Sequence, residues 1–541
     1  DYTAVPGTEN YYPWTNPSSI TVSNYDDYYQ AFNVFAEYSL SLAEKHNFKV
    51  LVGYNQEKKH NKYHWVGRKN LIDNDTPQIN LAYGDTSTSG SESMWATNGI
   101  FFRFNYDFMG KYLFEFNGRE DGSSKFAKGN RYAFFPSGSV AWRVSEEKFF
   151  EPLRSWWDNL KIRGSYGSLG NQNVSGNFPY LATYGVSTKA GVLLGGTRPV
   201  AVYAPGLVSS SFTWETVNQL DLGIDGTWLN NRLSASFDWY RRDTKDMLTK
   251  GATLPSVLGT GVPRSNAANM KTTGWEVSVE WSDRLSCGLG YHIKGVLSDY
   301  QSEITKYSND ARLLGDHYVG EKIGEIWGLV SNGLFQSDEE AANSPHLVGV
   351  VPKAGDIKYI DKNGDGKIDD DDRFVVGNDF PRYTFGFNYG LEVKGFYFSM
   401  FLQGVGKRSR WMRGESVEAF HNNNEGPVLD FHVDRWTPEN RDASYPRLTM
   451  GTESTNNATK SDYWIQNAAY LRIKNLQLGY SFPEAMLSKI RFKGLQVYLT
   501  CENPFVFSTM KGGWDPEYNA DGSGRAYPVA RVYSVGLNVK F

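Results

Sequence analysis

Arg531–Phe541 reads RVYSVGLNVKF, and this stretch decides the fold class. Apolar and polar residues alternate along it, with Tyr533, Val535, Leu537, Val539 and Phe541 on one face and Ser534, Gly536, Asn538 and Lys540 on the other. Alternation with a period of two predicts a β-strand that has one apolar face. About ten residues is also the length that a tilted strand needs to cross a bilayer's hydrocarbon. The stretch therefore predicts either a membrane-spanning strand or an edge strand of a soluble sheet.

The same alternation recurs in hairpins, and the clearest one surrounds Met109–Lys111. One face carries Ile100, Phe102, Phe104, Tyr106, Phe108, Tyr112, Phe114 and Phe116, and the other carries Arg103, Asn105, Asp107, Glu115 and Asn117. A soluble sheet rarely leaves such an aromatic face in water, so lipid is its simplest cover. A slip of one residue would move Arg103 into lipid, at about 2–4 kcal/mol near the midplane.

Composition narrows the class of protein further. The 541 residues are 40% hydrophobic and 15% aromatic, with 54 glycines and a net charge of −4. The sequence has no apolar run of 18 residues, so transmembrane helices are excluded. The small net charge gives no basic field for nucleic acid, so we expect no nucleic-acid partner. Cys287 and Cys501 stand in strand-like segments and form neither a metal motif nor a disulfide framework.

The connections between predicted strands fall into two sizes. Short ones include Met109–Lys111 and Leu229–Arg232, and long ones run over Leu169–Ser211, Tyr300–Pro381 and Gln403–Ala469. Short turns at one end and long loops at the other are typical of outer-membrane barrels. The sequence therefore predicts an all-β fold, a transmembrane antiparallel β-barrel of about sixteen strands, give or take two. It occupies residues 1–541 as one contiguous domain with long extracellular loops.

An acidic segment in the second long loop is the one motif that suggests a metal. Asp361 to Asp372 matches the calcium-loop spacing D-x-[DN]-x-[DN]-G, with candidate ligands at Asp361, Asn363, Asp365, Lys367 (through its backbone carbonyl), Asp369 and Asp372. Position 12 is Asp rather than the usual Glu, and its shorter side chain reaches less far. The alternative is a solvated acidic turn held by Asx hydrogen bonds. We expect a calcium ion that stiffens the loop.

Other features of the long loops suggest structure rather than chemistry. Ser337-Asp-Glu-Glu340 is a capping-box pattern and predicts a short helix. Arg408, Arg410, Trp411 and Arg413 are candidates to line a pore or hold a ligand, although loop arginines are more often solvated. No catalytic motif such as G-x-S-x-G, H-E-x-x-H or a P-loop occurs. We therefore expect that the protein is not an enzyme.

Several blocks together resemble the SusC/RagA family of TonB-dependent outer-membrane transporters. They are Gly320–Gly328 with Asn332–Gln336, Gly355–Asp361 running into Asn363–Asp369, Asp434–Asn440 with Tyr445–Arg447, Ala469–Asn475 with Leu478–Pro483, and Trp514–Glu517. The resemblance extends over essentially the whole chain. It implies energised import of an oligosaccharide or oligopeptide across the cell outer membrane.

The resemblance also implies parts that this sequence does not display. Family members carry a signal peptide, a plug domain with a TonB box and further strands, which complete a plugged barrel of about 22 strands. The sequence opens on DYTAVPGTEN without a signal peptide, so we expect that its first residue is not the start of the translated product. The expected partners are a SusD-like lipoprotein, the remaining N-terminal barrel and plug segment, TonB with ExbB and ExbD, and outer-membrane lipid.

Two alternatives stay open at this point. A barrel of sixteen strands can close by itself, so an autonomous passive porin is the first. The second is a soluble β-protein that binds or cleaves glycans, since aromatic-rich β domains often bind sugars. The substrate is not readable from the aromatic residues, because most of them belong to the outward face.

Overall fold

The computed structural model describes residues 17–541 except 175, 188–190, 210–211, 252–253, 310–312, 422–425, 451–454, 488–491, 518–521, 524 and 526. Fifteen strands form one antiparallel sheet in sequence order. These are β1 (Ser19–Leu42), β2 (His46–Lys69), β3 (Thr86–Phe108), β4 (Tyr112–Ser123), β5 (Tyr132–Arg143), β6 (Trp157–Asn171), β9 (Glu215–Trp228), β10 (Leu233–Lys250), β11 (Arg264–Arg284), β12 (Gly290–Lys306), β17 (Arg382–Val393), β18 (Phe396–Lys407), β21 (Tyr470–Ser481), β22 (Gly494–Ser508) and β23 (Val532–Lys540). The predicted all-β class and strand number are confirmed.

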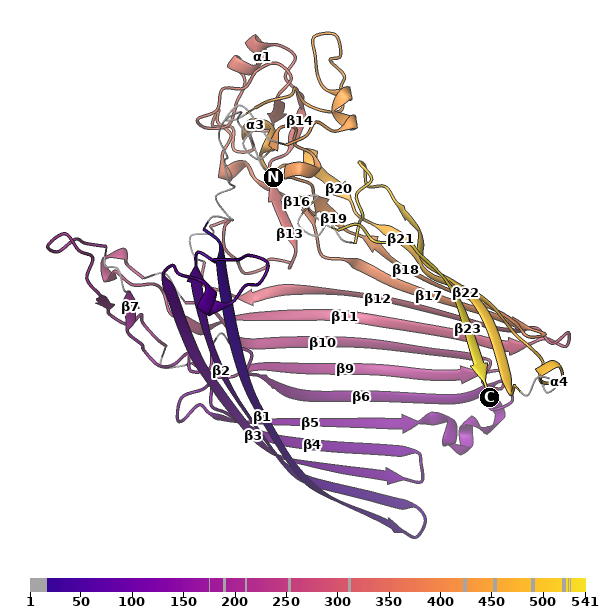
Figure 1. Cartoon of the computed structure of the whole chain (residues 1–541). Coiled ribbons are helices and arrows are strands. Elements are labelled where there is room, and N and C mark those ends of the chain that lie inside the picture. The colour runs from indigo at the N-terminus through magenta and orange to yellow at the C-terminus, as the bar shows by residue number, and fades with distance from the viewer. Residues whose placement is uncertain are drawn as a thin grey trace.

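The sheet curves into a trough, with β1–β3 on one side and β21–β23 on the other (Figure 1). Among the residues that the structure describes, β1 pairs only with β2 and β23 pairs only with β22. The trough therefore has two open edges. Within the same described ranges, no helix is long and apolar enough to cross a bilayer.

Short turns join neighbouring strands at one end of the sheet. Between β3 and β4, Met109 and Gly110 adopt left-handed backbone with φ of 55° and 70°, the conformation that tight hairpins need. The predicted turn at Leu229–Arg232 is confirmed as well. The expectation for Cys287 is wrong, because this exposed residue lies in the turn between β11 and β12, whereas Cys501 lies in β22.

The first three strands are much longer than a membrane requires. β1, β2 and β3 contain 24, 24 and 23 residues, roughly 80 Å at about 3.3 Å per residue. Near the short turn, β2 places Val50, Val52 and Tyr54 on one face. Farther along, Lys58 and Lys59 point to opposite faces, which lipid would not accept. The half of each strand near the turns suits the bilayer, and the other half extends beyond it.

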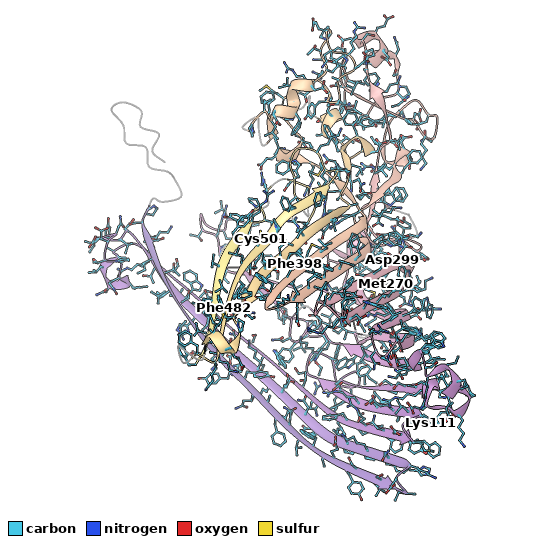
Figure 2. All side chains as sticks on the ribbon, turned by 90° about the vertical axis from the view of Figure 1, so that its right-hand side faces the viewer. Lys111, Met270, Asp299, Phe398, Phe482 and Cys501 are labelled. Atoms are coloured by element: carbon cyan, nitrogen blue, oxygen red, sulfur yellow. The ribbon has the colours of Figure 1, made fainter. Side chains whose placement is uncertain are left out.

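The second and third long loops fold together at the end of the sheet opposite the short turns (Figure 1). We call residues 307–381 and 408–469 the outer domain. Its elements are β13 (Glu325–Gly328), β14 (Ser331–Leu334), α1 (Asp338–Asn343), β15 (Ile357–Tyr359), β16 (Phe374–Asn378), β19 (Ser409–Trp411), α3 (Thr455–Ala458) and β20 (Ile465–Asn467). In the side view, Lys111 in the β3–β4 turn lies far from this domain (Figure 2).

The remaining short elements are β7 (Gly185–Ser187) and β8 (Ala201–Tyr203), which pair in the first long loop, and α4 (Glu484–Leu487), which precedes β22. The predicted capping of α1 is confirmed, since the Ser337 side chain accepts a hydrogen bond from the Glu340 backbone N–H. The Glu340 carboxylate reaches back to the Gln336 N–H at 2.8 Å rather than to that of Ser337.

The outer domain has a hydrophobic core of its own. Its buried members are Leu329, Ile357, Tyr359, Ile368, Met412, Val417, Tyr445 and Trp464. They come from both long loops, so neither loop can bury its apolar residues without the other. The long connections are therefore folded structure, which the sequence had indicated only as loops.

Candidate functional site

The β3–β4 hairpin separates its apolar and polar residues as predicted. On one face, the rings of Phe104 and Phe114 lie with centroids 6.3 Å apart. On the other, Arg103 Nε donates to Asn117 Oδ1 at 2.8 Å and Asn105 donates to Glu115 at 2.6 Å. The charged face lines the inside of the trough, where polar groups can find each other and water.

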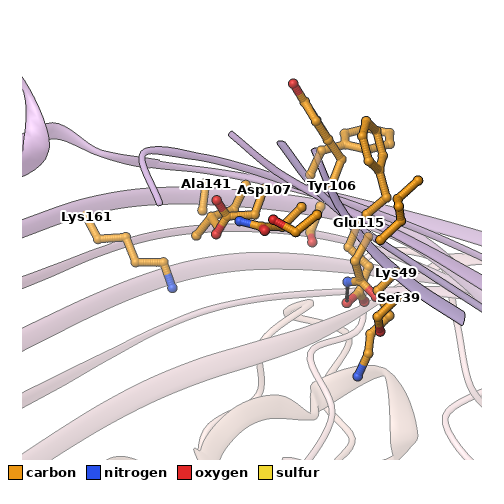
Figure 3. A pocket seen from close by; sticks show the side chains of 15 residues that line it. Ser39, Lys49, Tyr106, Asp107, Glu115, Ala141 and Lys161 are labelled. Carbon is orange, nitrogen blue, oxygen red and sulfur yellow. Dashed lines mark hydrogen bonds between the residues drawn. The ribbon is translucent and has the colours of Figure 1, made fainter. Parts of the chain in front are cut away.

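A cavity of about 610 Å³ lies along this wall near the short turns. Figure 3 shows Ser39 and Lys49 extending to one side of the sheet and Tyr106 to the other. Lys49 Nζ pairs with Glu37 at 2.8 Å, on the same polar face. The inner wall at this end therefore offers both charges and hydrogen-bonding groups to whatever occupies the trough.

Ion pairs continue along the inner wall at β6, β9 and β10. Arg163 contacts three aspartates, with distances of 3.0 Å to Asp225, 2.5 Å to Asp238 and 3.7 Å to Asp221. Three carboxylates around one guanidinium leave this region of the wall acidic. Such a set could not face lipid, so its strands have their polar side turned to an aqueous interior.

Asp356 and Arg447 hold the outer domain together. Asp356 is 1% exposed and Arg447 Nε lies 2.7 Å from its Oδ1. Asn457 donates to the same oxygen at 2.9 Å. Next to it, Gly355 has a φ of 85°, and a Cβ there would lie 2.4 Å from the ring of Trp436. The blocks Gly355–Asp361 and Asp434–Arg447 therefore meet in space, and their residues stabilise the domain.

The acidic segment forms a turn of hydrogen bonds in this structure. The carboxylate of Asp361 accepts the backbone N–H of Gly364 at 2.7 Å and of Gly366 at 2.8 Å. Asn363 accepts the N–H of Asp365 at 2.9 Å, and Asp365 accepts that of Lys367 at 2.9 Å. Each of these oxygens keeps a second lone pair, so an ion that prefers oxygen ligands is chemically compatible with them.

The last two candidate ligands are engaged differently. Asp372 is fully buried and accepts backbone N–H bonds from Lys362 and Asp369, both at 2.8 Å. Asp369 caps the short turn Asp370–Asp372. Over the described part of the chain, no group of three His, Cys, Asp or Glu side chains is placed to hold a metal ion. Calcium at this loop stays a prediction.

The arginines near Trp411 have structural partners. Arg410 is 2% exposed and pairs with Asp379 at 2.8 Å, and Arg408 Nε lies 3.1 Å from the same carboxylate. The guanidinium of Arg413 stacks over the ring of Trp411 at 5.5 Å. Solvation is wrong for Arg410, which is buried against Asp379, and a role of these arginines in holding a ligand stays a prediction.

A second ion-pair cluster ties the β22–β23 connection to the sheet. Arg472 in β21 is 2% exposed and donates to both oxygens of Asp515, at 2.7 and 2.6 Å. Arg472 also lies 2.7 Å from Glu517, and Lys474 lies 2.8 Å from it. Arg472 and Lys474 belong to the block Ala469–Asn475 and their partners to the block Trp514–Glu517, and nothing in the spacing of the two blocks pairs them. The opposite charges of the two blocks were the one signal from which their contact could have been predicted.

The cluster places Trp514 against the outer domain, where a second cavity of about 300 Å³ opens. We call it the aromatic pocket. It is bounded by β20, the β22–β23 connection and the third long loop, and its lining includes Phe431, Tyr445, Tyr463, Trp464 and Trp514. Desolvation raises the pKa of Tyr463 to about 12, so its hydroxyl stays protonated at any physiological pH.

Known proteins share this architecture. A TonB-dependent receptor of Formosa agariphila is 28% identical over 566 residues, which covers 99% of this chain and 53% of the relative. The TonB-dependent receptor SusC of Bacteroides thetaiotaomicron is 27% identical over 542 residues, with 98% and 51% covered. A structure of the RagAB peptide transporter superposes with a TM-score of 0.81 at 22% identity, covering 97% of this chain and 56% of that one.

The chain thus spans about half the length of the curated relatives it matches. The sequence profile described as "TonB dependent receptor-like, beta-barrel" matches residues 1–503. The resemblance to SusC and RagA is confirmed, and a location in the outer membrane contradicts the soluble alternative. This chain belongs to the TonB-dependent receptor β-barrel family, a family of receptors and transporters of the outer membrane.

Proposed function

We propose that this chain forms the barrel wall of a TonB-dependent importer that takes up oligosaccharides or oligopeptides with a SusD-like surface lipoprotein. The observation that carries the proposal is the charged inner wall around Arg163, which continues to a folded outer domain at the mouth. The names of two similar proteins agree with this proposal, since one is the TonB-dependent receptor SusC and the other is the RagAB peptide transporter.

The two open edges of the sheet bear on what else the importer contains. In lipid, the unpaired backbone of β1 and β23 would leave many N–H and C=O groups unsatisfied. We propose that residues 1–541 are the C-terminal portion of the barrel, and that a plug and further strands, in another segment or another chain, complete it. TonB, driven through ExbB and ExbD, would act on that plug.

We also propose that calcium stiffens the acidic loop through Asp361, Asn363 and Asp365. The support is the spacing of the three oxygen-bearing side chains and the left-handed turn at Gly366, with a φ of 84°. The ion would have a structural role in the outer domain. No part of the import step depends on it.

Uptake of labelled oligosaccharides and oligopeptides by cells with and without TonB tests the main proposal. We expect accumulation of one ligand class, lost when TonB is deleted. Uptake that continues undiminished without TonB would support the passive porin instead. Affinity purification of the receptor from cell envelopes tests the partner, since a lipid-anchored surface protein should copurify with it.

A further inference from the structure

The aromatic pocket is a built feature rather than a gap between loops. Its walls belong to segments far apart in the sequence, and Tyr445 and Trp464 are 8% and 7% exposed within the core of the outer domain. Trp514 is held in place by the neighbouring Asp515, which the buried Arg472 binds. The pocket therefore keeps its shape before any ligand arrives.

The polar atoms of the aromatic walls are all used internally. Tyr463 donates its hydroxyl to the Ser444 carbonyl at 2.8 Å, and the Tyr445 hydroxyl donates to the Val417 carbonyl. The indole N–H of Trp514 donates to the Ser416 carbonyl at 3.2 Å. What the walls offer to a ligand is consequently ring faces, which attract the C–H side of a flat or chair-shaped ring.

Three polar residues of the lining, Gln466, Asn467 and Lys511, carry donors that a ligand can use. Gln466 and Asn467 use their amide oxygens to accept backbone N–H groups of Lys511 and Ala469, at 2.8 and 3.0 Å. Their NH₂ groups have no hydrogen bond within the described part of the chain, and neither has the ammonium of Lys511. Of the described residues that line the pocket, none is Asp or Glu.

We propose that the aromatic pocket binds a saccharide unit that carries a carboxylate or a sulfate. The ring faces hold the sugar, Lys511 binds its anionic group, and Gln466 and Asn467 donate to its oxygens. A cavity of about 300 Å³ is at the lower end of small-ligand sites, which suits one or two sugar rings. This inference rests on the proposed import function and names the substrate class.

The lining favours a saccharide over a peptide. A peptide frequently carries cationic side chains, which need carboxylates as partners, and none of the described lining residues is Asp or Glu. An acidic sugar presents several acceptors and one anionic group around a compact ring. The pocket's single formal charge, on Lys511, matches that pattern.

Calorimetric titration of the full chain in detergent tests the assignment. The probes are tetragalacturonate, a sulfated carrageenan tetrasaccharide, neutral maltotetraose and tetraglutamate. We expect one of the two acidic saccharides to bind more tightly than maltotetraose and tetraglutamate. The K511Q variant should weaken that binding tenfold or more, since a hydrogen bond to a charged group is lost. K322Q, an exposed lysine of the outer domain outside the pocket, is the matched control and should bind as the parent does.

Variants of Tyr463 test whether the sugar stacks on an aromatic ring. Y463F keeps the ring and should retain saccharide binding, whereas Y463A removes the ring and should weaken it. Lys511 is exposed, so K511Q keeps the test valid if Y463A fails to fold. Failure of both acidic saccharides to bind, unchanged binding by K511Q, or tighter binding of tetraglutamate would each overturn the inference. If an acidic saccharide binds but its uptake does not depend on TonB, the importer proposal is overturned and the pocket assignment stands. If uptake depends on TonB but K511Q binds as the parent does, the pocket assignment is overturned and the importer proposal stands.

Discussion

Asp356 and Arg447, which are 91 residues apart in the sequence, form a two-point ion pair with N–O distances of 2.7 and 3.1 Å. The pair joins the second long loop to the third, and its carboxylate is almost completely buried. This ion pair thus joins two loops from different hairpins into one domain. Its contribution to the stability of the outer domain can be measured.

Replacing Asp356 with Ala should destabilise the outer domain by about 3–5 kcal/mol, because it removes the buried carboxylate that pairs with the half-buried Arg447. Limited proteolysis of the receptor in detergent measures this as faster cleavage within residues 307–469. Glu339 in α1 provides the control, since it is exposed and its Ala variant should be cleaved at the parental rate. Equal rates for both variants would mean that the pair contributes nothing.

The cluster of Arg472 with Asp515 should show energetic coupling in a double-mutant cycle. We expect R472Q and D515N to be coupled by about 0.5–3 kcal/mol, measured by hydrogen exchange of the amides at Met510–Trp514. The pair of Arg525 with Glu415 has a similar distance of 2.8 Å but is solvent-exposed. R525Q and E415Q should couple by no more than about 1 kcal/mol. Coupling of the same size in both cycles would contradict a role for burial.

His432 should make the outer domain sensitive to mild acid. Its Nδ1 accepts the Leu429 N–H at 2.8 Å and its Nε2 donates to the Val417 carbonyl at 3.0 Å, so the folded domain holds the neutral ring. Burial lowers the pKa of His432 below its ordinary value of 6.5. Between those two pKa values the unfolded chain binds a proton that the folded chain does not. Stability is therefore complete above about pH 6.5 and falls as the pH drops below it.

Thermal unfolding followed between pH 7.5 and 5.5 measures this dependence. The H432Q variant should lose stability overall but vary less with pH than the parent. An identical pH dependence in the two proteins would assign the acid sensitivity to other groups.

Calcium should protect the acidic loop if the ion binds there. We expect millimolar calcium to raise the unfolding temperature of the outer domain, and D361N to abolish the increase, because a bound ligand stabilises the folded state. D338N, at the first residue of α1, alters an acidic residue of the same domain outside the loop and should leave the increase intact. No calcium effect in the parent would leave the loop as a turn held by its own hydrogen bonds.

An added arginine in β3 should be tolerated on the inner face of the strand but not on the aromatic face. Phe104→Arg places a cation against lipid and should reduce stability by about 2–4 kcal/mol near the midplane. Asn105→Arg adds the same charge on the inner face and should be close to neutral. Denaturant titration of barrel refolding in lipid vesicles compares the two variants. Equal effects would show that the aromatic face of β3 does not meet the bilayer.

The parts predicted from sequence are those set by local periodicity. Arg103 and Phe104 are neighbours on opposite faces because a strand turns each successive side chain over, so their environments followed from spacing alone. The hairpin at Met109–Lys111 followed for the same reason. The strand number was predictable because each strand carries its own alternation.

The outer domain could not be predicted in the same way. Its core joins Ile357 of one loop to Tyr445 of another, and no period connects them. Arg410 illustrates the limit, since a lone arginine in a loop is most simply solvated, yet Asp379 lies against it in the fold. The aromatic pocket depends on the same long-range packing, so only the structure brings Trp514 beside Tyr463.

The strands of the sheet differ in length, so the end of the sheet opposite the short turns is uneven. β1–β3 have 23 or 24 residues each and extend well beyond the bilayer, whereas β4 and β5 have 12 residues each and end closer to it. A molecule that contacts the far ends of β1–β3 therefore lies farther from the membrane than one that contacts the ends of β4 and β5.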